Sequence, residues 1–231
     1  QAYEPRIASD GTGYAVTWLQ SDVTAQSIYA NIYSGSAWGG ATLIESGSGS
    51  ADTHFISRKG AGYGVVWQQP DSQGVSTIYA ALYATSWSSE TALVSGTYRT
   101  ASLLPKLATN SDGTTVAVWL QYNNYMPTIY ASENSSGAWS VPEIIRGDQN
   151  NFVSNPVLAT NGTTFMVVYQ KNSRLYARLY DGESWGTETP LEEPIVNSAE
   201  GLQIASNGTG YAVTWYQNDG STYSIYANIY S

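Results

Sequence analysis

An aromatic ring, an amide and an acid or second amide recur at alternate positions in four places along this chain. Alternation in an extended strand puts three such side chains on one side. The ring suits the apolar face of a sugar, the Gln amide both donates and accepts, and the third group accepts from a pair of hydroxyls. We therefore take these as candidate ligand-binding residues: Trp18, Gln20, Asp22, Trp67, Gln69, Asp71, Trp119, Gln121, Asn123, Trp215, Gln217 and Asp219.

The same residues also have a purely structural interpretation. The Trp would pack between sheets, the Gln would satisfy a neighbouring backbone group, and the Asp would open an Asx turn. Both interpretations hold together if a ligand lies in a shallow pocket between adjacent sheets. Only one unit departs from the pattern, with Tyr169, Lys171 and Ser173 at the three positions.

Few other residues are placed for chemistry. Glycoside hydrolysis needs two carboxylates about 5 to 10 Å apart, and no acidic pair stands out in the sequence. The single His, His54, falls in an expected loop and should be solvated or cap it. The chain has no Cys, and each turn carries one acid, so we name no catalytic residue, metal site or cofactor. Glu133 and Asn134 interrupt an apolar run, which predicts an open, solvated face there.

The composition restricts the possible partners and the location. Acidic residues number 18 against 9 basic ones, and the net charge of −9 argues against nucleic acid and anionic lipid as partners. No apolar run is long enough to insert into a membrane. There are 19 Tyr and 8 Trp against 3 Phe, so most rings carry a polar group. Together with many Ser, Thr, Asn and Gly residues, this composition favours a secreted or cell-surface, extracellular protein.

The chain consists of five similar units. Trp18, Trp67, Trp119, Tyr169 and Trp215 follow one another at intervals of 49, 52, 50 and 46 residues, each ending a run such as GYAVTW. A second run such as SIYANIY comes about ten residues later in each unit. A further Trp follows only in the first four units, at Trp38, Trp87, Trp139 and Trp185.

Each unit predicts four short antiparallel strands, because its runs are β-branched and aromatic and are separated by turn residues. Hairpin turns are expected at Asp10-Gly11, Asp112-Gly113, Asn161-Gly162 and Asn207-Gly208. Four-stranded units of this length are typical of propeller blades. We therefore predict an all-β, five-bladed β-propeller with about 46–52 residues per blade, the last blade lacking its fourth strand. It forms a single domain over residues 1–231, with blades at approximately 5–51, 52–102, 103–152, 153–200 and 201–231.

The likeness of the two ends of the chain predicts that the propeller closes into a ring, and recent duplication or excision from a longer array is the alternative explanation. Residues 7–34 and 204–231 are identical at 21 of 28 positions, whereas the end units of an open array usually diverge into caps. The runs are apolar on both faces, as expected of a sheet packed between two neighbours. The strand ending at Ser231 would then be a free edge, through which the protein could self-associate.

Two families resemble this sequence or its predicted architecture. The runs GYAVTWLQSD and SIYANIYSGSAW resemble a repeat of large secreted bacterial proteins that is predicted to form β-propellers. Five blades in about 230 residues are similar to the architecture of tachylectin-type lectins, in which each blade holds an amino-sugar site. Ser9-Asp10-Gly11-Thr12 departs from the Asp box of sialidase-type propellers, because the Trp comes too late.

The near symmetry and these resemblances favour a non-catalytic binding module over an enzyme. It would be a carbohydrate-binding, lectin-like or adhesive propeller of a secreted or cell-surface bacterial protein, with several weak sites acting together. The expected partner is a glycan or another protein. One alternative is a structural or protein-interaction scaffold that assembles through its open edge strand, and a third is a glycoside hydrolase.

Overall fold

The computed structural model describes residues 1–21, 25–47, 49–94, 99–147, 152–191 and 199–231. In this part of the chain the secondary structure is entirely β, and no helix is long and apolar enough to cross a membrane. The strands are β1 (Ala2–Ser9), β2 (Tyr14–Ser21), β3 (Gln26–Tyr33), β4 (Thr42–Leu43), β5 (Asp52–Lys59), β6 (Gly62–Pro70), β7 (Ser76–Tyr83), β8 (Thr91–Leu93), β9 (Arg99–Thr109), β10 (Thr115–Asn123), β11 (Met126–Asn134), β12 (Glu143–Arg146), β13 (Val153–Thr160), β14 (Phe165–Lys171), β15 (Arg174–Tyr180), β16 (Thr189–Pro190), β17 (Ala199–Ser206), β18 (Tyr211–Asn218) and β19 (Tyr223–Tyr230).

The first two strands of a sheet are joined by the turns that the sequence predicts. Asp10 Oδ1 accepts hydrogen bonds from the backbone N–H groups of Thr12 and Gly13 at 2.8 and 2.7 Å. Gly11 adopts φ +97°, a conformation that side chains with a Cβ rarely tolerate. Asn207 and Gly208, with φ +92°, repeat the same arrangement in the last sheet. Each Asx side chain therefore fixes a hairpin locally.

Each sheet is an antiparallel meander, with its strands hydrogen-bonded in the order in which they occur along the chain. Four sheets have four strands, and the last, β17-β18-β19, has three. This confirms the all-β, five-bladed propeller in which the last blade lacks its fourth strand. The further Trp of each four-stranded blade pairs with the end of the third strand, as in the bridge between Tyr33 and Trp38.

The hydrophobic core is divided into four clusters, one between each pair of consecutive blades. Alternate residues of one strand face different neighbours. In β6, Val65 and Trp67 pack toward the first blade, whereas Val66 packs toward the third. This two-sided packing explains why the central strands are apolar on both faces.

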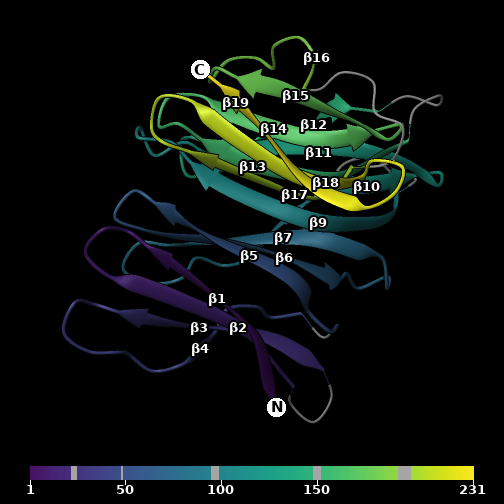
Figure 1. Ribbon diagram of the computed structural model, residues 1–231. Helices are drawn as coiled ribbons and strands as arrows, with labels where there is room; N and C mark the ends of the chain where they lie inside the picture. Colours follow the sequence, from purple (N-terminus) through teal and green to yellow (C-terminus); the bar gives the residue numbers. More distant parts are fainter. Residues whose placement is uncertain (22–24, 48, 95–98, 148–151, 192–198) are drawn as a thin grey trace.

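The predicted closure of the ring is wrong. The first strands of the blades pack in series, β1 on β5, β5 on β9, β9 on β13 and β13 on β17, but no comparable packing joins β17 to β1 in the described part of the chain. In Figure 1 the second blade separates the purple first blade from the yellow fifth blade. Ile7 of β1 is 64% exposed and Ile225 of β19 is 78% exposed. Similar sequences at the two ends determine similar blades, but the angles between successive sheets determine whether the ends meet.

Candidate functional site

The predicted Trp and Gln residues lie together in four blades and bind each other. Trp67 Nε1 donates to Gln69 Oε1 at 2.9 Å, and the other three pairs repeat this contact at 3.1, 3.4 and 2.9 Å. Each indole also stacks on a Tyr of the next strand, with ring centroids 5.9–6.0 Å apart. These stacked partners are Tyr29, Tyr79, Tyr130 and Tyr226.

Three of the four Trp–Gln pairs are buried between blades. Trp67 and Trp119 are fully buried and Trp215 nearly so, together with their Gln partners. Only Trp18 and Gln20, on the uncovered side of the first blade, are half-buried. The contacts thus support the packing interpretation, and sugar binding by these residues stays a prediction.

The third residues of the trio are held by the turn or strand in which they lie. Asp71 Oδ1 accepts from the backbone N–H groups of Gln73 and Val75. Asp219 accepts from the backbone of Thr222 and Ser221, which lowers its pKa to about 2. Asn123 instead bridges two side chains, accepting from Gln121 and donating to Tyr130. Asp22 lies outside the described residues.

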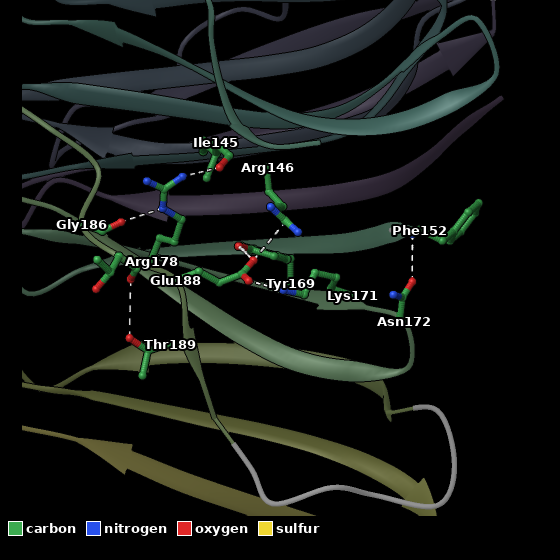
Figure 2. A network of polar contacts seen from close by, with 11 residues as sticks. Ile145, Arg146, Phe152, Tyr169, Lys171, Asn172, Arg178, Gly186, Glu188 and Thr189 are labelled. Atoms are coloured by element: carbon green, nitrogen blue, oxygen red, sulfur yellow. Dashed lines mark hydrogen bonds and ion pairs between the residues drawn. The ribbon is translucent and has the colours of Figure 1, made fainter. Parts of the chain in front are cut away.

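In the fourth blade a charged network replaces the Trp–Gln pair (Figure 2). The Tyr169 hydroxyl donates to Glu188 Oε1 at 2.6 Å, and Lys171 pairs with the other carboxylate oxygen of Glu188. Arg146, from the third blade, lies 3.2 Å from Glu188 Oε1. Burial first, and then the hydrogen bond to Glu188, raises the pKa of Tyr169. Because Tyr169 is 0% exposed, its phenol cannot reach a substrate, and we assign the network a structural role.

The predicted open face at Glu133 and Asn134 is wrong. Glu133 is half-buried and accepts a hydrogen bond from the Tyr180 hydroxyl of the next blade, while Asn134 is buried. Burial first, and then Glu133, raises the pKa of Tyr180. A partner on the adjacent blade thus compensates a carboxylate in an otherwise apolar strand, which the sequence of one strand does not reveal.

A β-bulge kinks each first strand of the five blades. One residue at the equivalent position of each strand has positive φ: Glu4, Thr53, Leu104, Asn155 and Gly201, at 50°, 29°, 55°, 52° and 61°. The pairing register with the second strand shifts beside each of them. Bulges redirect the side chains that follow and are common beside active sites. In three of these strands a Pro follows the bulged residue, where no backbone donor is needed.

The bulges of the last three blades surround a cavity of about 540 Å³. Its polar lining combines an amine, a carboxylate, a phenol and three amides, which belong to Lys106, Glu200, Tyr216, Asn155, Gln170 and Gln203. Apolar residues such as Val157 and Leu202 complete the lining. We call this the inner cavity. A concave site with a few converging polar groups is the usual form of a small-molecule binding site.

Inside the inner cavity, the Tyr216 hydroxyl donates to Glu200 Oε2 at 3.1 Å. This hydrogen bond, followed by the charge of Glu200, raises the pKa of Tyr216. Gly201 makes the arrangement possible, because a Cβ at this position would lie 2.4 Å from Tyr216 Cε1. Its φ of +61° also favours glycine. The bulge of β17 thus brings a carboxylate and a phenol into one wall of the cavity.

Lys106 contributes an amine to the β9 side of the cavity, whereas Glu200 contributes a carboxylate to the β17 side. Its Nζ lies 5.8 Å from the centre of the Phe55 ring. Burial first, and then the positive charge of Arg6, lowers the pKa of Lys106 to about 8. The amine is therefore mostly protonated at neutral pH and close to the range in which it can transfer a proton.

Sequence reasoning missed the inner cavity, although a signal for it existed. The second residue after each bulge is Arg6, Phe55, Lys106, Val157 and Gln203 in the five blades. This position therefore varies among the five blades, whereas the runs that end in Trp or Tyr are similar in all of them. His54 is a second correction, because it lies buried in β5 and not in a solvated loop. No group of three potential metal ligands occurs among the residues that the structure describes.

Solved structures similar to this chain are β-propellers. Hadza microbial sialidase Hz136 has a TM-score of 0.65 and 12% identity, covering 98% of this chain and 56% of that one. The β-propeller domain of the Trilobed protease from Pyrococcus furiosus, which has an open velcro topology, has a TM-score of 0.56 and 13% identity, covering 98% and 69%. Penicillium chrysogenum alpha-L-arabinanase complexed with arabinobiose has a TM-score of 0.58 and 10% identity, covering 94% and 71%.

This chain spans little more than half of the length of the sialidase structure, and at these identities the likeness concerns the fold. No family model matches the sequence, and no curated protein matches it significantly. None of these comparisons supports the resemblance to tachylectin-type lectins or to the secreted bacterial repeat.

The comparisons contradict the prediction of a non-catalytic binding module that is not an enzyme. The similar propellers include sialidases and an arabinanase, so the glycoside hydrolase alternative agrees better with them. The near symmetry of the blades is a poor argument against an enzyme, because the similarity of the packed faces does not extend to the inner strands. Five similar blades can carry one asymmetric site when residues such as Arg6, Lys106 and Gln203 replace one another there.

Proposed function

We propose that this chain is a glycoside hydrolase whose substrate binds in the inner cavity. The observation that supports it most directly is the hydrogen bond between Tyr216 and Glu200 in a cavity that Lys106 also lines. These are the three groups that bond cleavage requires: a nucleophile, a base for its proton, and an acid for the leaving group. The similar sialidase and arabinanase folds add support at the level of the fold.

Most glycoside hydrolases use two carboxylates, and some use a Tyr nucleophile instead. Glu200 is the one carboxylate among the described lining residues, and Tyr216 is its direct partner. In the first step, the phenol oxygen of Tyr216 bonds to the anomeric carbon while its proton passes to Glu200. The leaving oxygen takes a proton from the Lys106 ammonium as the glycosidic bond breaks.

A water molecule completes the cycle. Its oxygen bonds to the anomeric carbon, its proton returns to the Lys106 amine, and the bond from sugar to Tyr216 breaks. Glu200 then gives its proton back to the phenolate oxygen. All three side chains recover their initial protonation, and the net reaction is hydrolysis.

The charges around the inner cavity favour a sugar that bears a carboxylate. Lys106 and Arg6 are close enough for their charges to interact, so the β9 side of the cavity is positive although the net charge of the chain is −9. A neutral phenol also avoids the repulsion that a second carboxylate would exert on an anionic sugar. Such a glycan substrate is compatible with the secreted or cell-surface location that the composition predicts.

The test is release of the aryl group from a panel of aryl glycosides of neutral and carboxylate-bearing sugars. We expect turnover of a carboxylate-bearing substrate, with kcat/KM reduced by about 10²- to 10⁴-fold in Tyr216→Phe and in Glu200→Gln. Tyr169→Phe is the matched control, because it removes the phenol of a Tyr–Glu pair outside the inner cavity and should keep the activity. Absence of turnover across the panel by folded protein would overturn the proposal.

A further inference from the structure

Two blade faces at the ends of the propeller are uncovered. We call one the leading face of the first blade and the other the trailing face of the fifth blade. Ile7 and Tyr14 on the leading face are 64% and 46% exposed, and Ile225 and Ile229 on the trailing face are 78% and 77% exposed. The leading face consists of Ile7, Tyr14, Val16, Trp18, Tyr29 and Tyr33, and the trailing face consists of Ala212, Thr214, Ile225, Ala227 and Ile229.

The protein already contains an interface made of these same residue types, between its first and second blades. The first blade contributes Ala15, Thr17, Ile28, Ala30 and Ile32, which are the residue types of the trailing face in the same order. The second blade contributes Ile56, Tyr63, Val65, Trp67, Tyr79 and Tyr83, which are the residue types of the leading face in the same order. Each of these named positions is identical between the existing interface and the two free faces. Other positions of that cluster differ, because Tyr216, Glu200 and Asn31 stand in place of Leu19, Tyr3 and Ala81, and the fifth blade has no counterpart of Ile44.

Burial at the existing interface shows how well such faces fit. Ala15, Ile28 and Ala30 are 0% exposed there, and so are Val65 and Trp67 opposite them. None of the residues named for the two free faces is charged, and Glu200, the equivalent of Tyr3 in the fifth blade, meets no acidic residue among those named for the leading face. Two such faces bury apolar area when they meet, which favours association.

We propose that the trailing face of the fifth blade binds the leading face of the first blade of a second copy of this chain. The contact would continue the series of blade-to-blade interfaces across two molecules. The chain's own first blade is not the occupant, because β1 does not pack on β17 and the two end blades are separated in Figure 1. Since the two faces differ, the contact is heterologous and leads to rings or linear chains of molecules.

The first test measures the mass of the 231-residue chain by sedimentation at about 1 to 100 µM. The wild type should form dimers and larger species as concentration rises. Ile225→Lys/Ile229→Lys removes the trailing face, and Ile7→Lys/Tyr14→Lys removes the leading face. Each variant alone should be a monomer. Val141→Lys/Ile144→Lys is the control, because it alters exposed apolar residues, 86% and 57% exposed, that belong to neither face.

Mixing the two blocked variants gives the decisive result. Each retains the face that the other lacks, so an equimolar mixture should form 1:1 dimers and nothing larger. A wild type that stays monomeric at every concentration overturns the proposal. A blocked variant that still dimerises with itself also overturns it, because that result means contact between like faces.

A second measurement avoids dependence on charged substitutions. The chain has no Cys, so a single introduced thiol has one possible origin in any cross-link. Ile28 and Ile56 share one buried cluster, and their counterparts on the free faces are Ile225 and Ile7. A short bis-maleimide, which adds to one thiol at each end, should therefore join Ile225→Cys to Ile7→Cys in a mixture and should join neither variant to itself. Equal yields of like and unlike pairs would reject the heterologous contact.

Discussion

Two basic side chains of the first strands of their blades, Lys106 and His54, are buried, and burial lowers the pKa of each. Lys106 lines the inner cavity, whereas His54 lies between the first two blades, where it is 1% exposed. Within the described part of the chain, both ring nitrogens of His54 are buried without a hydrogen bond of normal geometry, and the backbone of Thr17 gives the protonated ring only partial compensation. Burial first, and then the charge of Arg6, lowers the pKa of His54 to about 4. The two residues lead to separate predictions, one for activity and one for stability.

We predict that activity falls as pH rises through about 8. Lys106 is the proposed acid, its pKa in the folded protein is about 8, and its proton is lost above that value. Lys106→Arg keeps the charge but moves the titration far above this range. The wild-type pH profile of kcat/KM should therefore show an alkaline limb near pH 8 that is absent in Lys106→Arg. An unchanged alkaline limb in the variant assigns that limb to another group.

We predict that acid destabilises the protein through His54. In the unfolded chain this His takes up a proton near pH 6.5, whereas in the folded protein it does so only near pH 4. Its contribution is thus present above pH 6.5 and is lost as pH falls toward 4, by up to about 3 kcal/mol. Urea unfolding at pH 7.5, 5.5 and 4.5 should show this loss, and His54→Gln should show a smaller one. Parallel pH dependence in both proteins would contradict this role.

At the scale of the blade, the recurrent Trp–Gln pair is buried in an inner blade and half-buried in the first blade. Gln69 accepts from the buried Trp67 indole and donates to Glu45 and to the Gly49 carbonyl, whereas Gln20 binds a half-buried Trp18. Burial removes the water that would otherwise replace a lost partner. The same Trp–Gln pair is therefore expected to contribute more to an inner blade than to the first blade.

This expectation is tested with an isosteric substitution at the two positions. Gln69→Met leaves the buried Trp67 N–H and Glu45 without their partner and should cost about 2 to 4 kcal/mol of unfolding free energy. Gln20→Met is the matched control and should cost less than about 1 kcal/mol, because water reaches the Trp18 N–H. Both values come from urea unfolding at pH 7.5. Equal costs would show that burial does not determine the contribution of the pair.

At the scale of the whole molecule, the open arrangement makes the stability of the blades unequal. Blades two, three and four are each packed on both faces, and the first and fifth on one face only. Their second strands have the same ladder of hydrogen bonds, so the difference comes from burial. Local opening follows the amount of buried contact.

We predict faster amide hydrogen exchange in the end blades. At a concentration low enough for the monomer, amides of β2 and β18 should exchange at least about tenfold faster than those of β10 and β14. Hydrogen exchange followed by mass spectrometry provides the measurement, with peptides from the middle blade as the internal reference. Equal protection in all five blades would mean that the end faces are covered in solution.

Local features of this protein were determined by the sequence alone. Alternating runs such as YAVTW specify strands, and Asp10-Gly11 and Asn207-Gly208 specify hairpins, because strands and turns depend on residues a few positions apart. The spacing of the aromatic residues gave the number of blades and the missing strand of the last one. These properties repeat in each unit and do not depend on how the units are placed.

Tertiary structure decided that the two ends of the propeller do not meet, which groups are buried and where the candidate site lies. Closure depends on the angle between successive blades, to which the identity of residues 7–34 and 204–231 contributes nothing. Whether Trp67 is buried and Trp18 is half-exposed depends on which blade has a neighbour. Lys106, Glu200 and Tyr216 come from three strands of two blades, and bulges bring them to one cavity. Contacts between residues so distant in the chain follow from the packing of whole sheets, which no local pattern encodes.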